Sequence, residues 1–244
     1  EDPTIPVMTS DRDTLEVSVH YETEDLLEGL KASDEKDGDL TDHILVGEFS
    51  QLIEKGLCNL SYVVFDSSNQ AATLTRRVYF TDYESPKLTL KSPLVFTEGR
   101  ISNALTGIGA RDMLDGDISA LVKQTDSTVN YQTAGAYTIS VEVTNSFGDV
   151  ESQTLPVHVI LPVQQALEIT LTENIVYIHA GDGFLPGSYV DGLEDSYGNA
   201  LDISLVTWDS QVDAQKPGCY EVHYTAENEN GLKGETWMTV IVRE

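Results

Sequence analysis

The stretch Gly29-Leu-Lys-Ala-Ser-Asp-Glu-Lys-Asp-Gly-Asp-Leu-Thr41 recurs in the chain as Gly107-Ile-Gly-Ala-Arg-Asp-Met-Leu-Asp-Gly-Asp-Ile-Ser119. Glycine, alanine, three aspartates and a branched aliphatic residue stand at the same positions in both segments. A degenerate third copy runs from Gly192 to Ser204 and ends in Asp-Ile-Ser. Repetition of this kind indicates one structural unit that is repeated along the chain.

Each copy is followed by a glycine 16 to 18 residues after its last aspartate, and at fixed spacing from that glycine by an Asp or Asn ten residues later and a valine 22 residues later. They are Gly56, Asp66 and Val78; Gly135, Asn145 and Val157; and Gly218, Asn228 and Val240. Prolines stand near the expected boundaries, where they can begin an edge strand or stiffen a short linker. We therefore predict three domains, residues 1–82, 83–161 and 162–244, of which the third has a degenerate first half.

The segments after the glycines alternate apolar and polar side chains, as a strand with one buried and one wet face requires. Tyr137, Ile139, Val141 and Val143 are the apolar set in the second copy, and residues 220–226 repeat the pattern in the third. The turns that follow contain Asn and Gly, which tolerate the positive φ of a hairpin. The fold predicted is all-β: three tandem immunoglobulin-like β-sandwich domains in an elongated arrangement, each about 30 Å long.

Charge and composition restrict the partners. The formal net charge is −27 and the isoelectric point about 4.2. Because nucleic acids and anionic lipids are bound through Lys and Arg, neither is expected as a partner. No apolar run approaches the roughly 18 residues of a membrane helix, so no membrane insertion is expected in this segment, and the acidic surface favours a monomer. The start at Glu1, without Met or signal peptide, suggests a processed segment.

The copies resemble the bacterial immunoglobulin-like domains of Gram-positive surface and secreted proteins, a family also found in a pesticidal crystal protein. Its pattern is Ala-x-Asp-x-x-Asp-Gly-Asp-Leu/Ile-Thr, then Gly-x-Tyr-x-Val-x-Tyr, an Asp-x-x-Gly-Asn turn and a Val-x-Val strand. The matching residues are 32–41, 56–70 and 76–80; 110–119, 135–149 and 156–160; and, without Asp-Gly-Asp, 218–224 and 238–242. The resemblance implies a sandwich fold and an extracellular role in adhesion, spacing or ligand display.

The repeated aspartates are the candidate metal ligands. They are Asp34, Asp37 and Asp39 in the first copy and Asp112, Asp115 and Asp117 in the second. Three carboxylates within six residues can converge on a hard cation such as Ca²⁺, the one cofactor considered, although the spacing is not that of an EF-hand. The alternative is an Asp-rich turn whose carboxylates accept backbone N–H groups.

Aromatic and sulfur side chains give further expectations. Tyr137 and Tyr220 resemble the tyrosine that fixes a sandwich corner through its hydroxyl. Cys58 is expected to be buried and Cys219 to be partly exposed on the opposite face, with no disulfide within a domain. Trp237 falls on the outer face and is the candidate ligand contact, unless a slipped register buries it. Trp208 is expected in the core.

Catalytic patterns are missing from the sequence. The histidines, which lie in no metalloprotease or serine-hydrolase motif, are His20, His43, His158, His179 and His223. We therefore predict a non-catalytic stalk or adhesion segment of an extracellular, bacterial cell-surface or secreted protein, with a host or cell-wall protein or a glycan as partner. The alternative is a carbohydrate-binding accessory region of a secreted glycoside hydrolase, with the aromatic residues of the third copy as the sugar platform.

Overall fold

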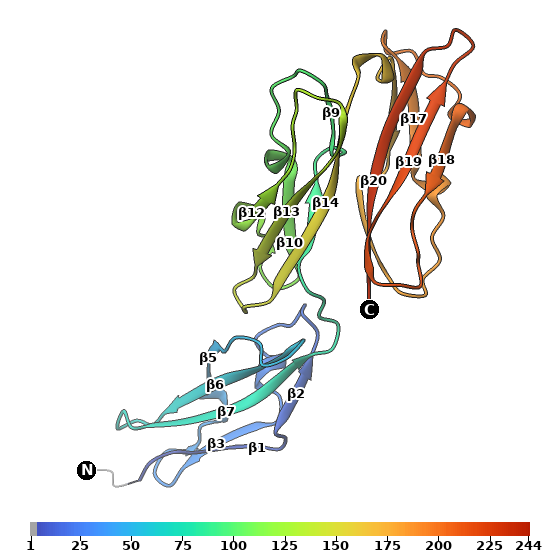
Figure 1. The fold of residues 1–244 in the computed structure, drawn as a ribbon. Helices are drawn as coiled ribbons and strands as arrows, with labels where there is room; N and C mark the ends of the chain where they lie inside the picture. Colours follow the sequence, from blue (N-terminus) through green and yellow to red (C-terminus); the bar gives the residue numbers. More distant parts are fainter. Residues whose placement is uncertain (1–3) are drawn as a thin grey trace. The chain divides into compact units, whose positions relative to one another are not determined.

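A computed structural model describes residues 4–244, and the chain is all-β, as predicted (Figure 1). Strands and single-turn 3₁₀ helices are the regular elements of these residues. Their six sheets pack as three sandwiches of immunoglobulin-like type, each around its own hydrophobic cluster. The start of the first predicted domain, residues 1–3, lies outside the described residues. No helix in the described part of the chain is long and apolar enough to span a bilayer.

The first sandwich pairs a sheet of order β1-β3-β4 with a sheet of order β2-β7-β6-β5. β2 runs parallel to β7, and the other neighbours are antiparallel. Its elements are β1 (Val7–Ser10), β2 (Thr14–Val17), η1 (Asp25–Leu27), β3 (Leu30–Asp34), β4 (Gly38–Asp39), η2 (Thr41–His43), β5 (Leu45–Phe49), β6 (Leu57–Phe65) and β7 (Ala71–Phe80). Alternate side chains of β6 face the core, where Leu60, Tyr62 and Val64 are buried.

The second sandwich repeats this plan, with sheets of order β11-β10-β8 and β12-β13-β14-β9 and with β9 parallel to β14. Its elements are β8 (Lys87–Leu90), β9 (Val95–Thr97), η3 (Ala104–Gly107), β10 (Ile108–Asp112), β11 (Gly116–Asp117), η4 (Ser119–Leu121), β12 (Lys123–Ser127), β13 (Gly135–Thr144) and β14 (Val150–Ile160). The alternation in β13 is confirmed, because Ile139, Val141 and Val143 are buried. Gly148 closes the predicted turn with φ +82°, a conformation that favours glycine.

The third sandwich has sheets of order β15-β17 and β16-β20-β19-β18, with β16 parallel to β20. Its elements are η5 (Pro162–Gln164), β15 (Leu167–Leu171), β16 (Ile175–His179), η6 (Pro186–Tyr189), β17 (Val190–Asp195), η7 (Ile203–Leu205), β18 (Val206–Ser210), β19 (Gly218–Glu227) and β20 (Lys233–Arg243). In the first two sandwiches the Gly-Asp of the repeated motif forms a two-residue strand. The third copy lacks that motif, and one isolated bridge, Glu194 to Ala200, stands there instead.

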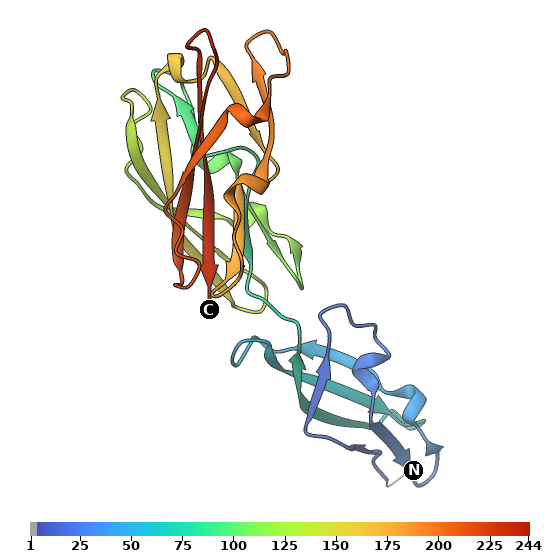
Figure 2. The ribbon, with the colours of Figure 1, turned by 90° about the vertical axis from the view of Figure 1, so that its right-hand side faces the viewer.

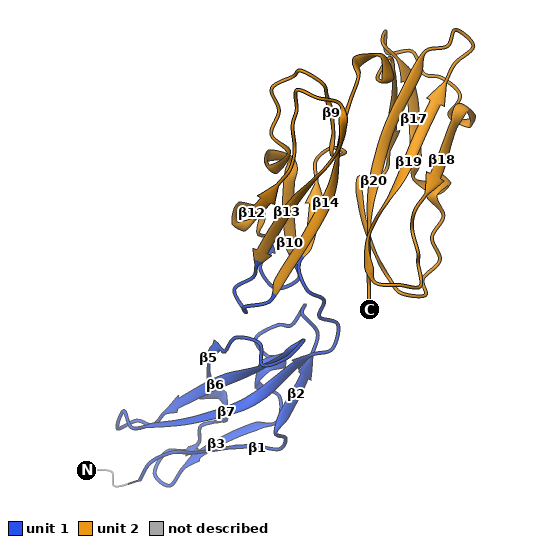
Figure 3. Cartoon of the chain, viewed as in Figure 1, with its two compact units in different colours: residues 1–86, 112–116, 144–149 blue, residues 87–111, 117–143, 150–244 orange. Residues whose placement is uncertain are grey.

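The chain divides into two compact units (Figure 3). Unit 1 comprises residues 1–86, 112–116 and 144–149, and unit 2 comprises residues 87–111, 117–143 and 150–244. Within unit 2 the second hydrophobic cluster takes in Ile241, and half-buried Tyr177 and Cys219 pack against it, although all three belong to the third sandwich. Packing is therefore continuous across residue 161, and the predicted boundaries at 82 and 161 stay a prediction.

Within unit 2 the second and third sandwiches lie along each other. β14 contacts β19, and contacts near both ends of β14 reach the third sandwich, from Glu151 to Arg243 and from His158 to Trp237. The chain turns back at η5. The third sandwich therefore lies beside the second instead of following it end to end. Figure 2 shows the ribbon after a quarter turn, with the third sandwich (orange to red) toward the viewer.

Candidate functional site

Trp237, the predicted ligand contact, is enclosed between two imidazole rings of unit 2. Its ring lies 3.8 Å from that of His158 and 4.2 Å from that of His223, with interplanar angles of 5° and 2°. The ladder of β19 and β20 runs without a bulge, so the slipped register considered as an alternative does not occur. Trp237 does face away from the third core, but the second sandwich covers it with His158.

Both imidazole rings are held by glutamates. His158 Nε2 lies 2.6 Å from Glu221 Oε2, and His223 Nε2 lies 2.5 Å from Glu235 Oε1. The other oxygen of Glu235 accepts a hydrogen bond from Gln164 Nε2 at 2.5 Å. Stacked rings whose edges are hydrogen-bonded have little freedom to turn, because each change of angle breaks a bond or a ring contact. Trp237, His158, His223, Glu221 and Glu235 therefore form a fixed contact, which we call the ring stack.

A second contact joins the same two sandwiches at the other end of β14. The hydroxyl of Tyr177 accepts the backbone N–H of Leu88 at 2.9 Å, and the Arg243 guanidinium lies 4.5 Å from the centroid of the Tyr177 ring. Arg243 also pairs with Glu151 at 2.5 Å. Burial raises the pKa of Tyr177, with the nearby Glu151 carboxylate acting in the same direction, so the phenol stays neutral.

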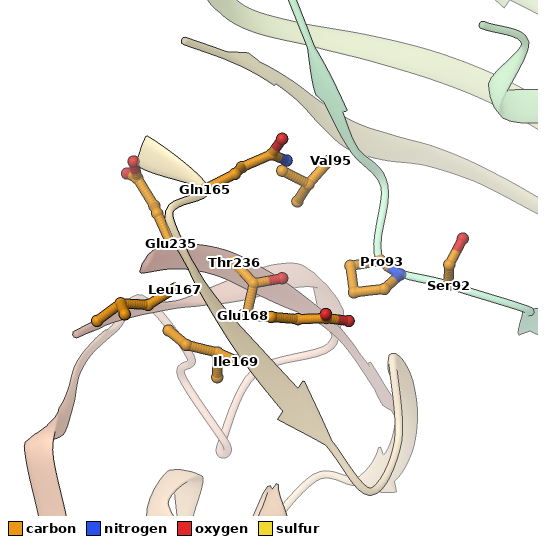
Figure 4. A pocket seen from close by; sticks show the side chains of 9 residues that line it. All are labelled: Ser92, Pro93, Val95, Gln165, Leu167, Glu168, Ile169, Glu235 and Thr236. Atoms are coloured by element: carbon orange, nitrogen blue, oxygen red, sulfur yellow. The ribbon is translucent and has the colours of Figure 1, made fainter. Parts of the chain in front are cut away.

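The hollow beside the ring stack is polar and lies between the two sandwiches of unit 2 (Figure 4). It has a volume of about 340 Å³ and is lined by Ser92, Pro93, Val95, Gln165, Leu167, Glu168, Ile169, Glu235 and Thr236. Glu235 and Glu168 are its carboxylates. Since both oxygens of Glu235 already accept hydrogen bonds, this carboxylate serves the packing, and the hollow contains no pair of uncommitted carboxylates of the kind that glycoside hydrolysis uses.

The predicted calcium ligands of the first copy are engaged in turns. One oxygen of Asp34 accepts the backbone N–H groups two and three residues further on, at 2.8 and 3.1 Å. Asp37 accepts both the N–H and the hydroxyl of Ser67 at 2.7 Å. Asp39 accepts the N–H of Thr41 at 2.9 Å, and hydrogen bonds from Thr41 lower the pKa of Asp39. The three carboxylates thus accept hydrogen bonds from different backbone segments.

The second copy repeats these contacts. Asp112 accepts the N–H groups two and three residues further on, at 3.0 and 2.9 Å, and Asp115 accepts both donors of Ser146 at 2.6 Å. Asp117 accepts the N–H and hydroxyl of Ser119, which lowers its pKa. Within residues 4–244 no three Asp, Glu, His or Cys side chains are grouped to hold a metal ion. The geometry matches the turn-forming alternative, and calcium binding has no support from it.

A turn role makes a stability prediction for Asp112. Replacing it with alanine leaves two backbone N–H groups and the buried side-chain amide of Asn145 without their acceptor, so we expect a loss of about 1–3 kcal/mol in the free energy of unfolding. Urea denaturation followed by circular dichroism measures this loss. The same loss is expected in EDTA and in millimolar calcium. A melting temperature that falls by several degrees when EDTA is added to the unmodified chain would instead favour a metal site.

The two cysteines are free thiols in apolar surroundings. Cys58 is buried in the first core, as predicted, and Cys219 is half-buried against the second cluster. Burial raises the pKa of Cys58 to about 11 and, together with Glu221 and Glu151, that of Cys219 to about 12. Because the thiolate is the reactive form, neither side chain is suited to nucleophilic chemistry at neutral pH.

Thiol reactivity tests this assignment. At pH 8 only about one Cys58 thiol in a thousand, and fewer of Cys219, is ionised in the folded chain. We expect Ellman's reagent to modify both cysteines at least a hundredfold more slowly than it modifies glutathione, and to titrate two thiols at once after denaturation. Rapid modification of one thiol in the folded chain would contradict the raised pKa.

Tyr137, Tyr220 and Trp208 are three further aromatic side chains with roles predicted from the sequence. The hydroxyls of Tyr137 and Tyr220 donate to the backbone oxygens of Thr133 and Lys216, both at 2.8 Å, which confirms their predicted corner role. Trp208 was expected in the core, and this was wrong, because 48% of it is exposed. It lies in the middle of the edge strand β18 and packs against Gly187, where an added Cβ would lie 2.5 Å from the indole ring.

The ring stack was missed from the sequence because its partners belong to different copies. His158 and Glu221 are separated by 63 residues and share no motif. The pairing of His223 with Trp237 could have been found, since the hairpin register sets them opposite each other. No local pattern signals that β14 packs against that hairpin.

The chain is similar in sequence to parts of two longer proteins. No family model matches the chain. It is 31% identical over 221 residues to the pesticidal crystal protein Cry22Aa of Bacillus thuringiensis, which covers 87% of this chain and 29% of that protein. It is 25% identical over 232 residues to an uncharacterized 81.3 kDa protein of Acholeplasma phage L2, covering 90% and 30%. The chain thus spans about a third of the length of these relatives.

Two solved structures are similar at low scores. One contains CBM51-2 in complex with GlcNAc and INT domains from Clostridium perfringens ZmpB, at 17% identity and a TM-score of 0.26, covering 61% of this chain and 26% of that one. The other is Drosophila N-cadherin EC1-3, at 11% identity and a TM-score of 0.30, covering 80% of each chain. The assignment of the fold rests on the sheets and cores described above, and these structures stand as likenesses only.

Proposed function

We propose that the chain is a non-catalytic adhesion or binding segment outside a bacterial cell, in which rigid β-sandwiches space and present a ligand-binding surface. The observation that carries the proposal is the ring stack. Its Trp, His and Glu side chains are the types that most often perform chemistry or bind ligands, and here they hold one sandwich against the next. Side chains committed to joining domains fit a scaffold better than an enzyme.

The other reactive groups support the same proposal. Both thiols have a raised pKa, and the repeated aspartates accept hydrogen bonds from backbone N–H groups in turns. The strongly negative charge keeps such a segment soluble and limits self-association. A cell-surface stalk of a Gram-positive protein is the specific form that we propose, with a host or cell-wall protein or a glycan as partner.

The test is a binding and turnover experiment on the full chain. Arrays of bacterial cell-wall glycans, host glycans and extracellular matrix proteins are probed with the labelled chain, and every bound glycan is then incubated with it and analysed for products by mass spectrometry. We expect saturable binding to at least one ligand and no product. Release of a product, or the absence of binding to all ligands, would overturn the proposal.

A second candidate function is carbohydrate binding in support of a secreted glycoside hydrolase, which the half-exposed indole of Trp208 favours. A flat, partly exposed ring that is held in place can stack on the apolar face of a sugar. The variant Trp208→Ala is expected to lose glycan binding if this function is correct, whereas Trp237→Phe is expected to retain it. With Trp237→Phe, Trp208 is the sole indole, and its fluorescence reports sugar binding directly.

A further inference from the structure

β18 is the end strand of the larger sheet of the third sandwich, and β5 and β12 are the end strands of the corresponding sheets (Figure 1). In β5 the register shifts between Val46 and Phe49, and in β12 it shifts between Gln124 and Asp126. Such irregularities protect an edge strand, because a bulge twists the edge away from any further strand. β18 pairs with β19 over Val206–Ser210 without a shift. The third sandwich therefore lacks this protection of its edge.

The free side of β18 presents backbone groups to solvent. Gln211, which follows the strand, donates its N–H to the Glu221 carbonyl at 3.1 Å. In an antiparallel ladder the residues that bond to the neighbour recur at every second position. The N–H groups of Trp208 and Ser210 therefore point away from β19, and both residues are exposed. These are groups to which an added strand can bond.

Trp208 lies at the centre of this edge. Its equivalents in the other copies are Val46 and Gln124, since each of the three pairs with the residue six positions after the repeated glycine. About half of the indole is exposed, and Ile203 and Leu205, just before the strand, are 49% and 39% exposed. When a peptide adds to a sheet edge, main-chain hydrogen bonds provide affinity, and contacts of alternate side chains provide specificity. The exposed indole offers such a contact to an apolar side chain.

The stretch around the edge is acidic. Residues 202–215 contain three exposed aspartates and no lysine, arginine or histidine, and Asp209 is the aspartate within β18. His223 stands opposite Asp209 in the ladder, but its ring is bound to Glu235. In the described part of the chain Asp209 has no ion-pair partner. This charge suits a basic partner and opposes a second copy of the chain, whose net charge is −27.

We propose that β18 binds an extended, basic peptide segment of a partner protein, which adds an antiparallel fifth strand to this four-stranded sheet. Backbone hydrogen bonds to Trp208 and Ser210 hold the segment, an apolar side chain packs on the indole, and a Lys or Arg side chain pairs with Asp209. Because Trp208 and Asp209 face opposite sides of the sheet, a sequence that alternates basic and β-branched residues fits both. The inference rests on the proposed adhesion function, to which it adds a class of protein partner and the strand that binds it.

The test measures amide exchange with water by NMR in the ¹⁵N-labelled full chain at pH 7. The probe is the peptide acetyl-Lys-Val-Lys-Val-Lys-Val-Lys-amide. We expect the amide protons of Trp208 and Ser210 to exchange about tenfold more slowly at about nine-tenths occupancy, because the added strand removes them from water. The same peptide with N-methylated valines lacks the donors that would face β18, so it is expected to give no protection.

Two substitutions test the contribution of charge. Asp209→Asn is expected to weaken peptide binding about twofold to fivefold, as the loss of an exposed ion pair does. Asp126→Asn removes the same charge from the bulged strand β12 and is expected to leave binding unchanged. A peptide with glutamate in place of lysine is expected not to bind.

The proposal is overturned if peptide added to about 1 mM leaves the exchange of both amides unchanged, or if the N-methylated peptide protects them equally. Glycans that shift the indole signal of Trp208, with no response to the peptide, would identify the carbohydrate alternative and overturn it as well. The glycan and protein arrays described above test the adhesion function separately. Binding on those arrays without a response to the peptide overturns the role of β18 alone.

Discussion

The substitution Asn145→Asp is expected to destabilise unit 1 by about 3 kcal/mol. The side chain of Asn145 is 4% exposed, and its amide nitrogen donates to Asp112 Oδ1 and to the Tyr83 hydroxyl, both at 2.9 Å. A carboxylate cannot donate these bonds, and it would face the Asp112 carboxylate in a buried place. Burial raises the pKa of Tyr83, and its hydroxyl already donates to Asp149, so it does not replace the lost donor.

The reverse substitution, from aspartate to asparagine, can be made at the equivalent position of the first copy. Asp66 stands where the second copy has Asn145, and Asp34 stands where it has Asp112. Asp34 Oδ1 is buried without a hydrogen-bond partner, unlike Asp112 Oδ1. Asp66→Asn supplies a donor at the equivalent place but loses the bond that Asp66 Oδ2 accepts from Gln70 Nε2 at 3.1 Å. The expected gain for unit 1 is therefore at most about 1 kcal/mol, which raises the melting temperature by up to about 4–8 °C.

Calorimetry and urea denaturation of Asn145→Asp and Asp66→Asn measure the two changes in stability. The two substitutions change the same atoms at equivalent positions in opposite directions, so each is the control for the other. If both variants lose stability, the equivalence of the two buried sites is wrong. If neither changes it, the amide donor of Asn145 does not contribute as its hydrogen bonds indicate.

The parts of the fold that could be predicted from the sequence are those set by local rules. Alternation fixes which face of β13 and β19 is buried, because neighbouring side chains of a strand point to opposite faces. The Asn and Gly residues fix the hairpins between them. Packing of one sandwich on another follows no such rule, since it depends on which outer faces meet. The position of β14 against β20, and with it the continuous cluster across residue 161, was therefore not predicted.

The candidate sites show the same division. The tyrosine anchors lie within four residues of their acceptors and were predicted. Trp208 was assigned to the core from its residue type, whereas its place on the edge strand β18 leaves about half of it exposed.

Replacing Trp237 with alanine is expected to cost unit 2 about 2–4 kcal/mol. The indole stacks on two imidazole rings, and each aromatic contact contributes about 0.5–1.5 kcal/mol beyond the area that it buries. Removing a large, half-covered ring adds the loss of that buried area and leaves a gap between the sandwiches. His158 and His223 also lose the surface that orients them toward Glu221 and Glu235.

The controls are Trp237→Phe and Trp208→Ala. Phenylalanine keeps a ring between the imidazoles, so we expect it to restore more than half of the loss. Trp208→Ala removes the same indole from a half-exposed place outside the contact, and a smaller loss is expected. The measurement is denaturant unfolding with hydrogen exchange of β14, which packs on the third sandwich. If Trp237→Ala costs less than 1 kcal/mol and leaves exchange in β14 unchanged, then the ring stack does not hold the two sandwiches together, and the scaffold function proposed from it loses its basis.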